Sequence, residues 1–135
     1  MTGSAAAPAP VEDALLEEIA GLVLEVKGRD VVSIDLRGAS AFTDFFLVAS
    51  ATSDRQARAI CEKVRTGLKE RYGLLPARTE GLPEARWALL DYGDVVLHVF
   101  SGELREHYRL EALWGELPRR DWDEDAQDAR DGEWS

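Results

Sequence analysis

The chain has 135 residues and a formal net charge of −10, with 45% hydrophobic and 31% charged residues. These values fit one folded domain and exclude an intrinsically disordered chain, while the lack of any apolar run of about 20 residues excludes a membrane-spanning helix. The acidic balance disfavours binding to nucleic acid phosphates and suits either a basic protein partner or simple solubility.

The N-terminal part is predicted to contain a flexible start and one helix. Residues 1–10 are small, uncharged and proline-containing, without the basic and apolar regions of a secretory signal, so we expect them to be disordered. Cys61 is the only cysteine and leaves no intrachain disulfide, so we expect the protein to be cytoplasmic. From Pro10 to Gly28 a helical periodicity of apolar residues predicts an amphipathic helix. These residues are Leu15, Leu16, Ile19, Leu22, Val23 and Val26. Residues 1–10 are therefore assigned to the disordered N-terminus, and the predicted domain begins at residue 11.

Two strands and a second helix follow. Val31–Leu36 and Phe45–Ser50 read as strands, and their connection is too short for a crossover helix, so they are expected to be antiparallel. The sequence Ser53-Asp-Arg-Gln matches a capping box and predicts a helix start, while Gly73 marks the end of that helix. Cys61 lies on its apolar stripe and is interpreted as a core residue rather than a nucleophile, because no histidine is nearby in sequence.

Basic residues concentrate off the apolar stripe of this second helix, and we interpret them as a solvated face. They are Arg55, Arg58, Lys63, Lys69 and Arg71. Leu74–Thr79 then predicts a short strand that runs parallel to the strand before the helix, as expected when a helix forms a crossover connection.

The segment Trp87–Phe100 carries the clearest strand signal, because two apolar runs flank the polar sequence Asp91-Tyr92-Gly93-Asp94. β-branched and aromatic residues around a glycine-containing turn predict a β-hairpin, here at the centre of a sheet. The second run is apolar except for His98, which indicates that both faces of that strand are covered. His98 is therefore either a hydrogen-bonded core histidine or a functional residue near a surface rim.

A third helix is predicted from Ser101, with Gly115 and Pro118 as its stop signals. Its large apolar positions are Leu104, Tyr108, Leu113 and Trp114. Residues 119–135 are acidic and poor in apolar residues, so we expect a disordered tail in which Trp122 and Trp134 are isolated aromatics. The predicted folded domain therefore covers residues 11–118.

No sequence pattern indicates catalysis. The chain lacks the GxGxxG and GxxxxGK[ST] phosphate loops and any HExxH or Cys/His cluster, so neither a cofactor nor a metal is predicted. Asp91 and Asp94 resemble paired carboxylates that hold a divalent cation, but hairpin turns select Asp and Gly for backbone reasons alone. Trp, Tyr and Arg residues near the hairpin and the third helix favour a binding module, because these residue types are enriched in interface hot spots.

Five segments, in order, carry a resemblance to a known family. They are Ser40-x-Phe42-Thr43-Asp44-Phe45-Phe46, Ser53-Asp54-Arg55-Gln56-x-x-Ala59-Ile60, Glu80-Gly81, the hairpin Trp87–Phe100, and Arg105-x-x-Tyr108-x-Leu110-Glu111-x-Leu113-Trp114-Gly115. Over residues 15–118 the chain resembles the ribosomal silencing factor family, RsfS, also known as Iojap. One departure is His107, at a position where the family usually has an aromatic residue.

The resemblance implies an α/β domain with a mixed, roughly five-stranded sheet flanked by helices, related to the nucleotidyltransferase fold but without its catalytic groups. It implies a homodimeric, non-enzymatic protein that binds a basic protein on the intersubunit face of the large ribosomal subunit. Such binding would block joining of the small subunit and repress translation when nutrients are scarce. Neither sequence-specific nucleic acid contacts nor a membrane are implied.

The partner-binding residues expected from the resemblance lie near the hairpin and the third helix. They are Trp87, Asp91, Tyr92, Asp94, His98, Arg105, Tyr108 and Glu111. Two alternatives stay open from the sequence. One is a nucleotide-binding protein of the nucleotidyltransferase type that uses Asp91 and Asp94 with magnesium, and the other is a dimeric scaffold with a non-ribosomal partner.

Overall fold

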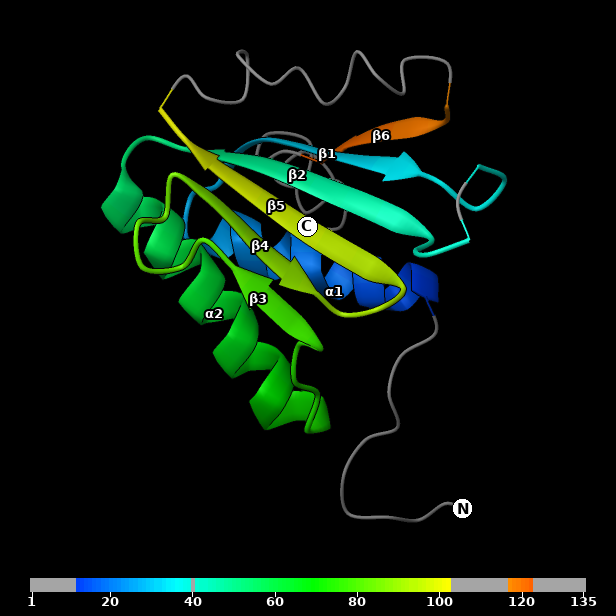
Figure 1. Cartoon of the computed structure of the whole chain (residues 1–135), viewed down its shortest axis with the longest axis horizontal. Helices are drawn as coiled ribbons and strands as arrows, with labels where there is room; N and C mark the ends of the chain where they lie inside the picture. Colours follow the sequence, from blue (N-terminus) through cyan, green and yellow to red (C-terminus); the bar gives the residue numbers. More distant parts are fainter. Residues whose placement is uncertain (1–11, 40, 103–116, 123–135) are drawn as a thin grey trace, which may run out of the picture.

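A computed structural model describes residues 12–39, 41–102 and 117–122, and within them the chain forms a six-stranded sheet and two helices (Figure 1). The elements in chain order are α1 (Glu12–Glu25), β1 (Arg29–Asp35), β2 (Phe45–Ala51), α2 (Asp54–Tyr72), β3 (Arg78–Glu80), β4 (Trp87–Asp91), β5 (Val95–Ser101) and β6 (Arg119–Trp122). No helix among these residues is long and apolar enough to cross a membrane.

The sheet is mixed, with the strand order β3-β4-β5-β2-β1-β6. β2 and β5 pair in parallel, while β1 with β2, β1 with β6, β3 with β4 and β4 with β5 pair antiparallel. The expected antiparallel pair and the expected hairpin are therefore confirmed, and β5 lies inside the sheet between β4 and β2. β3 runs in the same direction as β2, as predicted, although β5 and β4 lie between them.

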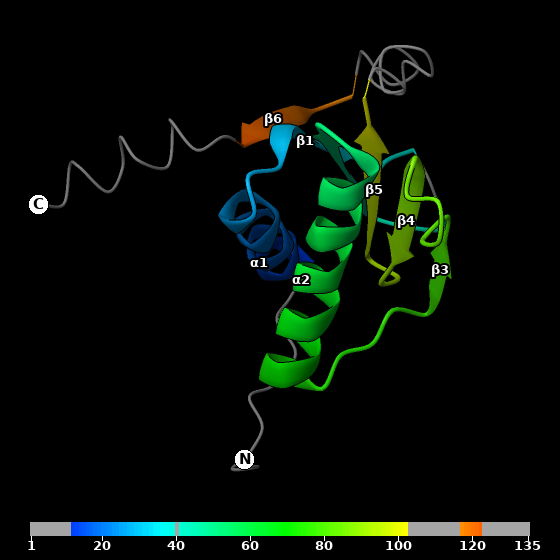
Figure 2. The same ribbon diagram turned by 90° about the vertical axis from the view of Figure 1, so that its left-hand side faces the viewer.

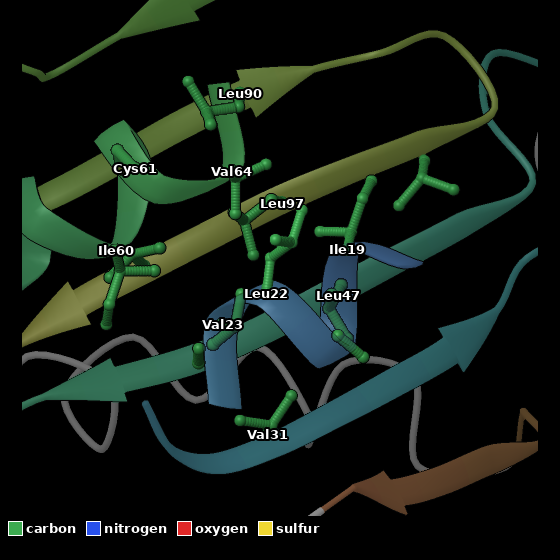
Figure 3. Close-up of a cluster of buried hydrophobic side chains, with 14 of the residues drawn as sticks. Ile19, Leu22, Val23, Val31, Leu47, Ile60, Cys61, Val64, Leu90 and Leu97 are labelled. Atoms are coloured by element: carbon green, nitrogen blue, oxygen red, sulfur yellow. The ribbon is translucent and has the colours of Figure 1, made fainter. Parts of the chain in front are cut away.

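Both helices lie on the same face of the sheet and form a second layer (Figure 2). Side chains alternate across a strand, so Val95, Leu97 and Val99 of β5 contribute to the core under the helices. Figure 3 shows part of this core, in which α1 contributes Ile19, Leu22 and Val23, and α2 contributes Ile60, Cys61 and Val64. The apolar stripes predicted from the sequence thus meet over the middle strands.

Local signals explain where α2 begins and ends. The backbone N–H of Gln56 donates to Ser53 Oγ at 3.1 Å, as the capping-box pattern predicts, while the Gln56 side chain accepts from the N–H of Thr52. The Gln56 amide nitrogen also donates to the carbonyls of Val26 and Lys27, which ties the start of α2 to the end of α1. Gly73 ends α2 in the left-handed conformation, with φ of 65°.

We expect Ser53→Ala to lower the free energy of unfolding by about 1 kcal/mol, because the first turn of α2 loses a side-chain acceptor for its amide. Urea denaturation followed by circular dichroism measures the change. Ser53→Asp is the matched control, since aspartate also caps helices and should unfold close to the wild type. Equal losses in both variants would contradict a capping role.

The structure corrects the C-terminal boundary of the domain. We expected disorder from Arg119 onward, but Arg119–Trp122 forms β6, which pairs antiparallel with β1 through residues 31–34. Trp122 is buried rather than isolated, and its Nε1 donates to Ser33 Oγ at 3.0 Å. The strand expected over residues 74–79 is also shorter and later, at Arg78–Glu80. The predicted third helix lies largely in residues 103–116, outside the described part of the chain.

Candidate functional site

A partly exposed strip of side chains lies along β4 on the sheet face opposite the helices. Ala88 and Leu90 belong to the core under the helices, so the alternating residues Trp87, Leu89 and Asp91 face the other way. The neighbouring edge strand β3 places Glu80 opposite Leu89 and Arg78 opposite Asp91. We call this set, Arg78, Glu80, Trp87, Leu89 and Asp91, the β4 surface. Its two apolar residues are flanked by charged side chains.

Trp87 is held in place by an aromatic cluster on the same sheet face. Its ring stacks on Phe100 with centroids 5.0 Å apart, and its Nε1 donates to His98 Nδ1 at 3.1 Å. His98 in turn packs against Phe46 with ring centroids 4.6 Å apart. Side chains that are fixed before binding lose less conformational entropy on association, so Trp87 is suited to act as an interface anchor.

The hydrogen bond from Trp87 also determines which ring nitrogen of His98 carries the proton. Because Nδ1 accepts, the neutral ring carries its proton on Nε2. Burial lowers the pKa of His98 to about 4, so the ring is neutral at physiological pH. Its Nε2 is buried and has no hydrogen-bond partner within the described residues. Of the two possibilities raised by the sequence, these properties favour a core histidine that positions Trp87.

The turn between β4 and β5 presents acidic groups at one end of the β4 surface. One carboxylate oxygen of Asp91 accepts from the backbone N–H of Gly93 at 2.8 Å, and the other lies 3.8 Å from Arg78 Nε. Gly93 has φ of 88°, which explains the glycine at this position. Asp91 therefore contributes to the shape of the turn as well as to its charge. Asp94 is exposed, and its carboxylate is presented to solvent.

A second loop is joined to this turn by backbone hydrogen bonds. The carbonyl of Asp94 accepts from the N–H groups of Asp44 and Phe45, at 3.0 and 2.9 Å. Phe42 lies two residues before Asp44 and is 93% exposed. Phe42 belongs to one of the segments that carry the family resemblance, but it is not among the binding residues expected from that resemblance. The sequence signal for the exposure of Phe42 is an aromatic side chain in a polar loop next to a strand.

The structure places Tyr92 apart from the other hairpin residues. Tyr92 belongs to the core under the helices, and only 8% of its surface is exposed. Burial raises the pKa of its hydroxyl to about 12. The β4 surface therefore includes Trp87 and Asp91 but not Tyr92, and the other predicted residues Arg105, Tyr108 and Glu111 lie outside the described residues.

Two properties of the described residues bear on metal binding and on the reactivity of Cys61. Within the described ranges, no group of three or more His, Cys, Asp or Glu side chains is placed to hold a metal ion. Burial raises the pKa of the Cys61 thiol to about 12, which leaves it protonated and therefore a poor nucleophile at neutral pH. The core position predicted for Cys61 is confirmed.

Comparisons with known proteins agree on one family. The family model described as "RsfS: Ribosomal silencing factor during starvation" matches residues 8–135. The ribosomal silencing factor RsfS of Bacillus subtilis is 37% identical over 112 residues, which cover 83% of this chain and 94% of that protein. The chloroplastic protein Iojap of Arabidopsis thaliana is 35% identical over 109 residues, which cover 77% of this chain and 45% of that protein.

Two solved structures have the same fold. A crystal structure of a protein from Chromobacterium violaceum superposes with a TM-score of 0.75 at 31% identity, covering 78% of this chain and 88% of that chain. A crystal structure of a protein from Bacillus halodurans superposes with a TM-score of 0.72 at 36% identity, covering 82% of this chain and 99% of that chain. The mixed α/β architecture expected from the sequence is therefore confirmed, with six strands among the described residues where roughly five were expected.

Proposed function

The chain belongs to the RsfS family of ribosomal silencing factors, and on that premise we propose that it binds a basic protein on the intersubunit face of the large ribosomal subunit. The bound domain would block joining of the small subunit and so repress translation when nutrients are limiting. The names of the relatives support a role in ribosomal silencing. The homodimer expected from the sequence resemblance stays a prediction.

The observation that carries the proposal is the composition of the β4 surface and the adjoining turn. Trp87 and Leu89 provide a partly exposed apolar centre, and Asp91 and Asp94 place negative charge at its end. Protein interfaces combine an apolar centre containing aromatic anchors with a polar rim. Carboxylates at that rim accelerate approach and select a basic partner, because opposite charges steer association.

The mechanism requires no covalent step. Within the described residues, the sheet and both helices share one hydrophobic core, and closely packed cores resist deformation. A rigid domain seated on a subunit-joining face occupies space that the other subunit needs. Silencing then depends on the occupancy of the site, and occupancy depends on the affinity of the β4 surface for its partner.

We expect Asp91→Asn combined with Asp94→Asn to weaken binding to purified large subunits by about tenfold. Asparagine keeps the side-chain oxygen that accepts from Gly93, so the turn is retained while two negative charges are removed. A loss of about 1.4 kcal/mol is consistent with removing two rim charges that face a basic partner. Co-sedimentation with large subunits, small subunits and joined ribosomes measures the affinity and its selectivity.

The matched control is Glu17→Gln combined with Glu25→Gln, which changes the net charge equally on α1, in the helical layer on the other face of the sheet. Both glutamates are exposed and form surface ion pairs, with Arg120 and Lys63, that contribute little to stability. The control should bind like the wild type. Equal weakening of both double variants would assign the effect to overall charge and remove the turn from the interface, and failure of the wild type to bind large subunits would contradict the proposed function.

A further inference from the structure

Helix α2 carries a line of exposed positive charges in an otherwise acidic protein. It contains six basic and three acidic residues, whereas the whole chain has a net charge of −10. Four of the basic residues are spaced so that they share one face of the helix: Arg55, Arg58, Arg65 and Lys69, all exposed. We call these four residues the α2 stripe. The buried residues of α2, such as Ile60 and Val64, lie on the opposite side of the helix.

Among the described residues, the charges of the α2 stripe are not neutralised by carboxylates, in contrast to the other basic residues of α2. Lys63 and Arg71, the other two basic residues of α2, pair with Glu25 and Glu18 of α1. Within the described part of the chain, no carboxylate forms an ion pair with the α2 stripe. Arg58 donates to the carbonyl of Pro83, which orients its guanidinium but does not neutralise it. The α2 stripe is therefore available to an external anion.

Two features favour a polyanion over a small ligand. The α2 stripe extends from residue 55 to residue 69, about 21 Å along the helix at roughly 1.5 Å per residue, which is too long for a single small anion. Three of its four residues are arginines, whose planar guanidinium groups hydrogen-bond phosphate oxygens in pairs. A row of phosphates spaced along a nucleic acid backbone matches this arrangement, because it presents repeated charge over the same length.

The α2 stripe also lies near the edge of the sheet that carries the β4 surface. The hydrogen bond from Arg58 to Pro83 joins α2 to the loop between β3 and β4, and that loop leads directly into Trp87. A partner protein at the β4 surface and a neighbouring RNA segment can therefore be contacted from adjacent sides of one domain (Figure 2). This placement matters on a ribosomal surface, where protein and RNA alternate.

We propose that the α2 stripe contacts the phosphate backbone of ribosomal RNA beside the protein bound at the β4 surface, an inference that rests on the proposed function. The rest of the acidic domain is repelled by RNA, so the α2 stripe adds affinity and fixes one orientation of the bound domain. The contact is independent of base sequence, since phosphates carry no sequence information.

The test compares Arg65→Ala combined with Lys69→Ala against Lys63→Ala combined with Arg71→Ala. Both double variants remove two positive charges from α2, but only the first lies on the α2 stripe. We expect the stripe variant to bind large subunits about tenfold more weakly and the control to bind like the wild type. The slope of log affinity against log salt concentration should fall in magnitude by about 1.5 for the stripe variant, because each lost phosphate contact contributes about 0.7 to 0.9.

Hydroxyl-radical footprinting of the large-subunit RNA separates RNA from an acidic protein partner. We expect the full-length wild type and the control variant to protect a short backbone segment that the stripe variant leaves exposed. Equal affinity of the two double variants, or weaker binding by the stripe variant with unchanged RNA protection, would overturn the inference while leaving the proposed function intact. A wild type that binds no large subunits would overturn both.

Discussion

Trp122→Ala is expected to lower the free energy of unfolding by about 3 kcal/mol, at the lower end of the range for truncating a buried tryptophan. Only 7% of Trp122 is exposed, and its ring belongs to the core under the helices. Loss of the indole would also leave the buried Ser33 hydroxyl oxygen without the N–H group from which it accepts a hydrogen bond. Urea denaturation measures the change in the free energy of unfolding, with far-ultraviolet circular dichroism as the readout because the variant lacks a tryptophan that would contribute to fluorescence.

Two further variants separate packing from the hydrogen bond and from surface charge. Trp122→Phe keeps most of the apolar volume but removes the donor to Ser33, so a loss of about 1 kcal/mol is expected. Arg120→Ala removes a guanidinium that lies 3.6 Å from the indole centroid and should cost less than about 1 kcal/mol. A Trp122→Ala protein as stable as the wild type would show that β6 is not part of the cooperative fold.

A chain that ends at Pro118, the boundary predicted from the sequence, provides a direct comparison. It lacks β6 entirely and exposes the edge of β1 from Val31 to Ile34. We expect it to be at least as destabilised as Trp122→Ala, because backbone pairing is lost together with the tryptophan. Unpaired strand edges also favour association with other chains, so this truncated chain should aggregate more readily.

The elements that could be predicted from the sequence are those whose signals are local. The capping box before α2, the glycine after it and the apolar runs on both sides of the β4–β5 turn each lie within a few residues of the structure that they specify. β6 has no such signal, because Arg-Arg-Asp-Trp shows neither alternation nor an apolar run. Trp122 is buried by pairing with Val31, a residue far away in sequence, so only the tertiary fold reveals it.

The candidate site shows the same division between local composition and sheet geometry. The mixture of acids and aromatics around the turn predicts one patch, and the structure brings two of its residues, Trp87 and His98, into hydrogen-bond contact. Tyr92 departs from that patch because side chains alternate along a strand, so Ala88, Leu90 and Tyr92 face the helices while Trp87 and Leu89 face away. This alternation is visible in the sequence once one residue of β4 has been assigned to a face. The exposure of Phe42 required the loop conformation itself.

His98 is expected to make the fold less stable in mild acid. Its pKa is lowered to about 4 in the folded state by burial, against an ordinary value of 6.5. The neutral ring is therefore favoured by folding, and its contribution is fully present above pH 6.5. As the pH falls from 6.5 to about 4 the unfolded chain takes up a proton that the folded chain does not, so about 3 kcal/mol of stability is lost across this interval.

The comparison of the wild type with His98→Gln isolates this effect. Glutamine can accept the Trp87 N–H through its side-chain oxygen but does not titrate, so the variant should lose less stability than the wild type between pH 6.5 and 4. All other titrating groups are common to both proteins, and their contributions cancel in the difference of the two pH profiles. Parallel profiles would show that His98 is not held neutral by the core. A difference of the expected size would mean that His98 stays neutral in the folded protein down to about pH 4, so Trp87, the proposed anchor, keeps its hydrogen-bond acceptor over this interval.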